Sequence, residues 1–212
     1  TRPDSVSGWQ GIYFNYSSPA SELAYCVIER ATFHGIRVDQ SSPNIHDCAI
    51  RRNTSATGAS SFGAGIYSNS PLTLRHCTIS DNVVSAYAWS PTGRGGGICS
   101  SGALQLFDCV ISRNSVSATA SAGYGATYAL GGGLYADSAA VTMQRCMVVD
   151  NTAAATPYWG GRNSSGAGIY SKNRFGACNT IIARNQTLSG SGNHGSGVYV
   201  GGGDAVLLNC TI

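Results

Sequence analysis

The sequence predicts an all-β solenoid in which short parallel strands stack coil upon coil. One pattern recurs along the 212 residues: Gly-x-Gly-Ile-Tyr, a short apolar run, and then Cys-x-Ile-x-x-Asn, seen most clearly in residues 63–82. Apolar and polar residues alternate within that pattern, at 72–74 and 77–79, with the two-residue period of strands. The 28 glycines disfavour helices. One strand-rich unit per repeat, stacked on its neighbours, is a solenoid.

The repeats predict about seven coils, whose Gly-Ile segments lie near residues 11, 35, 65, 97, 133, 168 and 197. Steps between successive cysteines of the pattern range from 22 to 37 residues up to the fifth coil. Almost all of that variation falls between the asparagine and the next glycine, so each coil should carry one variable loop, and these loops should share one face. Residues 1–212 are expected to form a single domain, which is either a whole subunit or a segment of a longer assembly.

Equivalent residues of stacked rungs lie about 4.8 Å apart, so they should form columns. The aliphatic residue of Cys-x-Ile should fill the core, and the cysteine two positions earlier should point the same way. A disulfide framework is the alternative, but it typically staples a domain that lacks a core. We therefore expect free thiols in this column. The cysteine column contains Cys26, Cys48, Cys77, Cys109, Cys146 and Cys210.

A column of asparagines ends each Cys-x-Ile strand. Asparagine tolerates a left-handed backbone, and stacked amides can bond to one another and to the turn. We therefore interpret these asparagines as structural. The column contains Asn53, Asn82, Asn114, Asn151 and Asn185. No Cys-x-x-Cys or Cys-x-x-His spacing occurs, so we expect no metal site and no cofactor.

The Gly-Gly-Gly-Ile motif at 95–98 and the Cys-x-Ile-x-x-Asn motifs are similar to the repeats of bacterial surface proteins, including polymorphic outer-membrane proteins. Over nearly its whole length the chain resembles the right-handed parallel β-helices of the pectate-lyase-like superfamily. The resemblance implies that fold. It implies no single function, because the fold hosts lyases, hydrolases, adhesins and passive scaffolds.

The acidic residues argue against catalysis. Four of the ten alternate with basic residues in the two columns that precede the cysteines and the asparagines, and the rest are dispersed. Hydrolases of the superfamily need paired carboxylates, and its lyases need a calcium cluster with a basic proton acceptor. No carboxylate pair recurs at one position of adjacent coils. We therefore assign no catalytic residue, and keep a carbohydrate-active enzyme or sugar-binding module of pectate-lyase-like type as the alternative.

Aromatic residues offer the candidate binding surface. One column follows Gly-Ile, includes Tyr67 and Tyr135, and should lie on the outer surface. Others occur in the variable loops among Ser, Ala and Gly, a composition that suits adaptable contacts with sugar rings or a partner subunit. The alternative is that these rings fold down over the sheet. The loop candidates are Tyr87, Trp89, Tyr124, Tyr128, Tyr158 and Trp159.

We therefore expect a structural protein: an extracellular or cell-surface scaffold, an adhesin segment, or a filament subunit that stacks on itself. The formal charge of +3 is scattered and does not indicate nucleic acid. No stretch reaches the roughly 18 apolar residues of a membrane helix. The start at Thr1 suggests a processed chain, and the final Cys-x-Ile suggests head-to-tail stacking with a second copy or a neighbouring β-helix segment. Glycans are the other expected partner.

Overall fold

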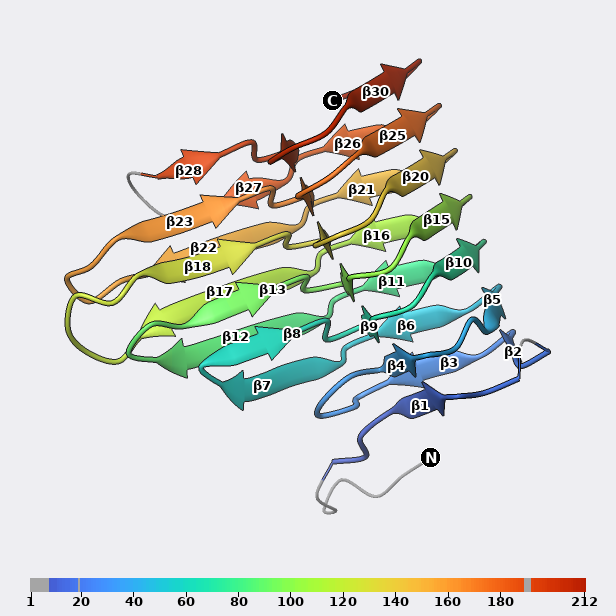
Figure 1. Ribbon diagram of the computed structural model, residues 1–212, viewed down its shortest axis with the longest axis horizontal. Helices are drawn as coiled ribbons and strands as arrows, with labels where there is room; N and C mark the ends of the chain where they lie inside the picture. Colours follow the sequence, from blue (N-terminus) through green and yellow to red (C-terminus); the bar gives the residue numbers. More distant parts are fainter. Residues whose placement is uncertain (1–7, 19, 189–191) are drawn as a thin grey trace.

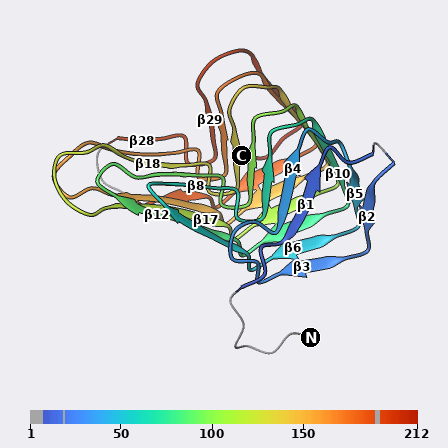
Figure 2. The same cartoon turned by 60° about the horizontal axis from the view of Figure 1, so that its bottom comes forward.

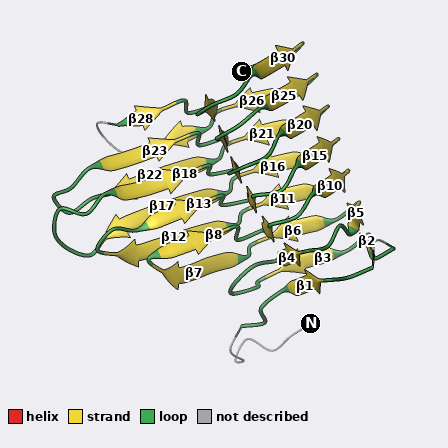
Figure 3. Ribbon diagram, viewed as in Figure 1, coloured by secondary structure: helices red, strands yellow, loops and turns green. Residues whose placement is uncertain are grey.

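The computed structural model describes residues 8–18, 20–188 and 192–212 and contains thirty strands. No helix occurs among these residues, and the strands pair in parallel (Figures 1 and 3). The leading segment 1–7, with Asp4, lies outside the described residues. The all-β solenoid predicted from the repeats is confirmed.

Each complete coil passes through five strands, one in each of five sheets that we call A to E. Five coils are complete. The first coil contributes strands to sheets A, B and C only, and the last contributes strands to A and B only. Sheets A and B therefore have seven strands each, but the solenoid makes about five full turns rather than the predicted seven.

Sheets A, B and C form a three-sided prism. Sheet A contains β1 (Ile12–Asn15), β4 (Ile36–Asp39), β9 (Ile66–Ser68), β14 (Ile98–Ser100), β19 (Leu134–Ala136), β24 (Ile169–Ser171) and β29 (Val198–Val200). Sheet B contains β2 (Glu22–Ala24), β5 (Asn44–His46), β10 (Leu72–Arg75), β15 (Leu104–Phe107), β20 (Val141–Gln144), β25 (Phe175–Cys178) and β30 (Ala205–Leu208). Sheet C contains β3 (Val27–Glu29), β6 (Ala49–Arg51), β11 (Thr78–Ser80), β16 (Val110–Ser112), β21 (Met147–Val149) and β26 (Ile181–Ala183).

Sheets D and E form a thin extension that we call the flange, which projects from the prism (Figure 2). Sheet D contains β7 (Thr54–Gly58), β12 (Val83–Ala88), β17 (Ser115–Ala120), β22 (Thr152–Thr156) and β27 (Gln186–Thr187). Sheet E contains β8 (Ser60–Phe62), β13 (Thr92–Arg94), β18 (Thr127–Leu130), β23 (Arg162–Ser165) and β28 (Asn193–His194). The strands of D run outward and those of E return.

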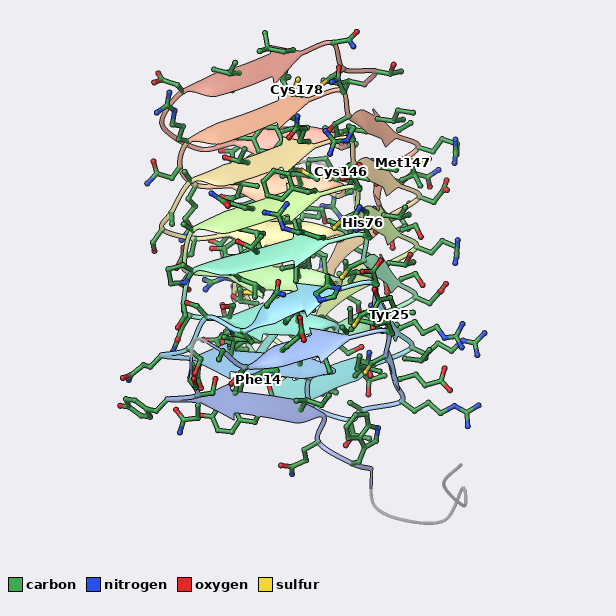
Figure 4. The ribbon with its side chains drawn as sticks, turned by 90° about the vertical axis from the view of Figure 1, so that its right-hand side faces the viewer. Phe14, Tyr25, His76, Cys146, Met147 and Cys178 are labelled. Atoms are coloured by element: carbon green, nitrogen blue, oxygen red, sulfur yellow. The ribbon has the colours of Figure 1, made fainter. Side chains whose placement is uncertain are left out.

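The prism core consists of aliphatic side chains and thiols stacked in register. Ile79 pairs with Ile50 on one side and Ile111 on the other, and all three are fully buried. Their neighbours Cys77 and Cys109 belong to the same cluster. Equivalent side chains form rows one above another when the prism is seen from its side (Figure 4). All eight cysteines are free thiols.

A left-handed residue makes each of two turns in the prism. One precedes the cysteine, between sheets B and C, and the other precedes the asparagine after sheet C; Asp108 (φ 55°) and Arg113 (φ 53°) are examples. The asparagine itself does not take this conformation, because the residue before it makes the turn. That leaves the asparagine side chain free to point into the solenoid, where Asn114 is fully buried.

The asparagine side chains form a continuous line of hydrogen bonds. Each amide nitrogen from Asn53 to Asn151 donates to the side-chain oxygen of the next asparagine at 2.9–3.0 Å. It also donates to a main-chain carbonyl of the preceding coil, such as Ile79 O for Asn114, at 2.9 Å. The side-chain oxygen accepts the backbone N–H of the preceding asparagine as well. Buried polar groups at this corner are thereby satisfied.

The segments between asparagine and glycine are mostly strands, not the variable loops that the sequence suggested. Sheets D and E pack face to face over a core of small side chains. Its buried members are Ala64, Val84, Ala86, Val116, Ala118, Ala129, Ala153, Ala155 and Ala167. Gly93 fits because a methyl group there would lie 2.6 Å from Val116 Cγ2. Alanine and glycine let the two sheets approach closely, so only the tips of the flange are loops.

We expect Ala118→Leu to lower the free energy of unfolding by about 2 kcal/mol, because three additional carbons would enter this tightly packed layer. Ala118 is fully buried in β17, whereas its neighbour Thr119 lies on the outer face of the same strand. Thr119→Leu is the matched control and should change stability by less than about 0.5 kcal/mol. Urea unfolding of both variants measures the difference. Equal effects would show that the flange interior is not tightly packed.

Candidate binding surface

Three of the loops at the tip of the flange, residues 89–91, 121–126 and 157–161, stack on one another, and we call them the flange edge. Four of the six aromatic candidates lie there: Trp89, Tyr124, Tyr158 and Trp159, each between 57% and 80% exposed. The other two lie on the strands themselves. Tyr87 is on the outer face of sheet D and Tyr128 is on the outer face of sheet E. The six candidates therefore do not share one face, but four of them share one edge.

The Trp89 ring is supported by the next loop of the edge. A methyl group on Gly123 would lie 2.3 Å from the ring atoms Cη2 and Cζ2, and one on Gly125 would lie 2.7 Å from Cδ1. Both glycines therefore leave room for the indole. The third loop rests on the second in turn, since the Trp159 N–H donates to Gly123 O at 3.0 Å. The loops order one another, and the Trp89 ring still presents most of its surface to solvent.

A hollow of about 490 Å³ lies at the third loop, lined by residues 157–162 and Gly192. Its aromatic wall is the pair Tyr158 and Trp159, whose ring centroids are 5.4 Å apart at an interplanar angle of 86°. Gly160 and Gly161 expose main-chain groups beside these rings, and Arg162 lines the same hollow. The volume falls within the range of about 300–1,000 Å³ typical of small-molecule sites.

The flange contains no carboxylate. In residues 54–62, 83–94, 115–130, 152–165 and 186–194 the only charged residues are Arg94 and Arg162. The tip loops themselves consist of Trp, Tyr, Ser, Pro, Ala and Gly. The contact chemistry of the edge is therefore that of aromatic faces, hydroxyl groups and main-chain amides.

The second aromatic column lies where sheet A meets the flange. Tyr135, Tyr170 and Tyr199 stack with centroid distances of 5.2 Å and 4.8 Å. The column is on the outer face of sheet A, as predicted, yet Tyr135 is only 1% exposed because the flange covers it. Burial raises the pKa of Tyr135 to about 12 and that of Cys99 in the same column to about 12. These rings pack the corner and leave little surface for a ligand.

Arg94 fills the gap that Cys99 leaves in this stack. Its guanidinium carbon lies 5.5 Å from the Phe62 ring centroid and 5.3 Å from that of Tyr135, so two cation–π contacts hold it. We did not anticipate this residue from the sequence. Its position in the repeat is the one sequence feature that could have indicated it. Arg94, like Phe62, immediately precedes a left-handed glycine of the Gly-x-Gly motif.

A family model described as right handed beta helix region matches residues 5–103. The match spans the first three coils and part of the fourth, and the strand order of the structure continues without change through the remaining coils. The fold of the chain is that of a right-handed parallel β-helix. Comparison with curated proteins and with solved structures finds no match.

Most acidic groups of the β-helix are engaged with basic partners on the prism. Arg113 and Asp81 approach to 2.8 Å, Arg145 and Asp108 to 2.7 Å, and Arg184 and Asp150 to 2.7 Å. In each pair the hydrogen bond from arginine lowers the pKa of the aspartate. The Lys172 ammonium does the same for Asp137. Carboxyl groups held ionised in this way are unsuited to donate a proton at neutral pH.

Two carboxylates of the β-helix lie in one outer column of sheet A. Asp39 is the last residue of β4 and Asp137 follows β19, with Asn69 and Ser101 between them in that column. Three rungs separate them by about 14 Å. Pairs of carboxylates in glycosidases are about 5–9.5 Å apart. Among the described residues, no group of three or more His, Cys, Asp or Glu is arranged to hold a metal ion. None of the described segments is a helix able to cross a bilayer.

His34 is a buried histidine beside Tyr67, at the corner where sheet A meets the flange. Its Nδ1–H donates to Gly63 O at 2.8 Å, and its ring stacks on Tyr67 at 5.2 Å. Burial lowers its pKa from 6.5 to about 4, with a smaller contribution from the nearby Arg37 that Asp39 partly offsets. The folded protein therefore keeps this ring neutral at pH values where the unfolded chain is protonated.

The free energy of unfolding should fall as the pH is lowered from about 6.5 to about 4, because the unfolded state binds the proton first. The full pKa difference corresponds to a loss on the order of 3 kcal/mol. His34→Gln keeps a donor for Gly63 O but does not titrate, so its stability should depend less on pH in this window. Urea unfolding at several pH values measures this, with the exposed His194→Gln as the control. Parallel profiles for wild type and His34→Gln would contradict the assignment.

Proposed function

We propose that this β-helix is a structural scaffold of the cell exterior, in the manner of an adhesin segment, and that the flange edge is its contact surface. The proposal rests on one observation above others: four exposed aromatic rings are gathered on three loops that support one another. Aromatic residues with few rotatable bonds lose little entropy on contact, which makes such an edge suited to binding.

The titratable groups support a non-catalytic role. Most carboxylates of the prism are paired with arginine or lysine, and Asp39 and Asp137 are too far apart to flank one scissile bond. Glu22 and Asp47 instead lie against the two ring nitrogens of His46, at 2.9 and 2.7 Å. The resemblance of the repeats to those of bacterial surface proteins supports the location. The prism then serves to hold the flange edge in place along the axis of the solenoid.

Attachment of bead-bound protein to bacterial and animal cells and to polysaccharide-coated wells tests this proposal. The double variant Trp89→Ala/Trp159→Ala should attach at least tenfold less than wild type. The control double variant Tyr16→Ala/Tyr25→Ala removes two rings from the prism that are 71% and 81% exposed, and should attach normally. Equal attachment of all three proteins would contradict the contact role of the edge. Release of reducing ends or unsaturated products from the polysaccharides would instead indicate an enzyme.

We also propose that a further β-helical rung, from this polypeptide or from a second copy, stacks on the edge of β29 and β30. All four residues of β30 are exposed, including Val206, Leu207 and Leu208. Leu207 is in register with the buried Ala177, so its side chain is on the core side of sheet B. An apolar strand edge of this kind is a template for pairing.

Leu207→Arg should abolish such stacking, because a charge on the core side of the last rung cannot be covered by an apolar rung. Sedimentation velocity of the 212-residue chain should show larger species as its concentration rises, and the variant should remain monomeric. Val206→Arg, on the outer face of the same strand, is the control and should still self-associate. A wild-type chain that stays monomeric at all concentrations would remove the second copy as the partner.

A further inference from the structure

We infer that the flange edge binds a neutral glycan, with hexopyranosyl rings placed against Trp89 and against the pair Tyr158 and Trp159. This inference rests on the proposed contact role of the edge and names its ligand. It concerns the loops at the tip of the flange and not the sheets of the prism.

The exposed aromatic faces of the flange edge are complementary to the faces of sugar rings. One face of a hexopyranose with equatorial hydroxyls presents C–H groups whose hydrogens carry partial positive charge, and these meet the negative face of an aromatic ring. The edge offers such faces on successive coils, each more than half exposed. Sugar hydroxyls need donors and acceptors beside the rings, and the hollow is lined there by the main chain of Gly160 and Gly161 and by Arg162.

The rings of the flange edge are held in place before any ligand binds. The Trp89 indole lies in a bed made by Gly123 and Gly125, where side chains larger than hydrogen would collide with it. Gly160 fits against the second loop equally closely, since a methyl group there would be 2.3 Å from both Tyr124 O and Gly125 O. Rings fixed before binding lose little entropy when the ligand arrives. Loops that served only to cover the sheet would not need to leave these rings exposed.

The charge of the flange also suits a neutral ligand. The flange has no carboxylate, and Arg162 is the one charged residue beside the flange edge. A lipid surface fits less well. Membrane-surface segments present Leu, Phe or Trp together with several Lys or Arg, and the tip loops contain no Leu, Ile, Val, Phe or Lys.

An array of neutral and acidic glycans, with vesicles of phosphatidylcholine and phosphatidylglycerol as a separate arm, tests the inference. Wild-type protein should bind neutral hexopyranosyl glycans and leave the vesicles free. For the strongest glycan on the array, tryptophan fluorescence then gives the affinity. Two of the three tryptophans report on the edge, and Trp9 does not, because it is partly buried with its indole N–H donating to Glu29 O at 2.9 Å.

Trp159→Ala and Trp89→Ala should each weaken binding at least tenfold, whereas Trp159→Tyr should retain most of it because a ring face remains. Gly125→Ala keeps every aromatic residue but displaces the Trp89 ring, and should also weaken binding. Tyr25→Ala on the prism is the control and should bind as wild type does. Unchanged thermal unfolding midpoints would show that the edge variants remain folded.

Binding to acidic glycans only, binding to vesicles only, or no glycan binding above background would each overturn the inference. Glycan binding that survives both tryptophan-to-alanine variants would do so as well. Failure here is distinguishable from failure of the proposed function. A protein that binds no glycan, yet attaches to cells in a manner that depends on Trp89 and Trp159, would keep its contact role with another kind of partner.

Discussion

Replacing Asn114 with alanine is expected to lower the free energy of unfolding by about 3–5 kcal/mol. Asn114 sits at the middle of the asparagine column and is fully buried. Its side-chain oxygen accepts two hydrogen bonds from Asn82, at 2.9 and 3.1 Å, and its amide donates to Ile79 O and to Asn151. Truncation leaves the partners unsatisfied in a site without solvent, and each such group costs about 1–3 kcal/mol.

Chemical denaturation measures this loss, and a second variant identifies its cause. Asn114→Asp has nearly the same shape, but it replaces both donors by an oxygen that faces two acceptors, so it should be at least as destabilising. The control is Asn44→Ala, which removes an exposed asparagine of strand β5 whose amide donates to Glu22 Oε1 at 3.2 Å. It should cost less than about 1 kcal/mol. An Asn114→Ala variant as stable as the control would show that the line of amides contributes little.

Gly97→Ala is expected to lower the free energy of unfolding by about 3 kcal/mol, near the upper end for overpacking. A methyl group at this position would lie 2.6 Å from Gly133 O and 2.9 Å from Asn114 Nδ2. Neither atom can move easily, since one belongs to the main chain of the next coil and the other is held by the asparagine column. A methyl group at Gly65, Gly133 or Gly168 would likewise lie too close to a glycine carbonyl oxygen of the next coil and to an asparagine side chain.

Gly176→Ala is the matched control, because it lies in a strand of the same prism and a methyl group there would meet only Val141 O, at 3.9 Å. It should be neutral or should stabilise the protein by up to about 1 kcal/mol, since alanine restricts the unfolded chain. Guanidinium unfolding of both variants gives the comparison. A Gly97→Ala variant that matches Gly176→Ala would mean that the coils can separate locally at no cost.

The prism could be predicted from the sequence because its residues alternate with strong contrast. Ile79 and Cys77 are apolar, the residues between and beside them are polar, and the same contrast returns in each coil. A two-residue period that repeats with a glycine and an asparagine at fixed places sets both the strands and their register. Only the number of complete turns differed, because the first and last coils lack flange strands.

The flange could not be predicted in the same way. The segment 115–120 reads Ser-Val-Ser-Ala-Thr-Ala, in which alanine is buried and serine or threonine is not. The difference in hydrophobicity between these residues is small, so the alternation is weak in the sequence. What makes the strands stable is the close approach of sheets D and E, and that is a property of two segments together.

The gathering of the aromatic candidates could be predicted in part. The sequence suggested that the six share one face, and Trp89, Tyr124, Tyr158 and Trp159 do lie at one edge. The placement of Tyr87 and Tyr128 on opposite faces follows from the strands of the flange, which the sequence did not reveal. The corner occupied by Arg94 was missed because a single arginine before a glycine has no distinctive pattern.

The independence of the tip loops from the prism has a consequence for how such proteins diversify. The loop between β7 and β8 is a single residue, Ala59, whereas the one between β17 and β18 spans residues 121–126. Sheet E nevertheless keeps its register from β8 to β18, and sheet D shifts only between Val84 and Ala86, where β12 pairs with β7. Insertions in the tip loops leave the strands of each coil unchanged, and those strands stabilise the fold. Duplication of one coil would add both a layer of the prism and a new tip loop, so gene-level slippage can vary the flange edge without a new architecture.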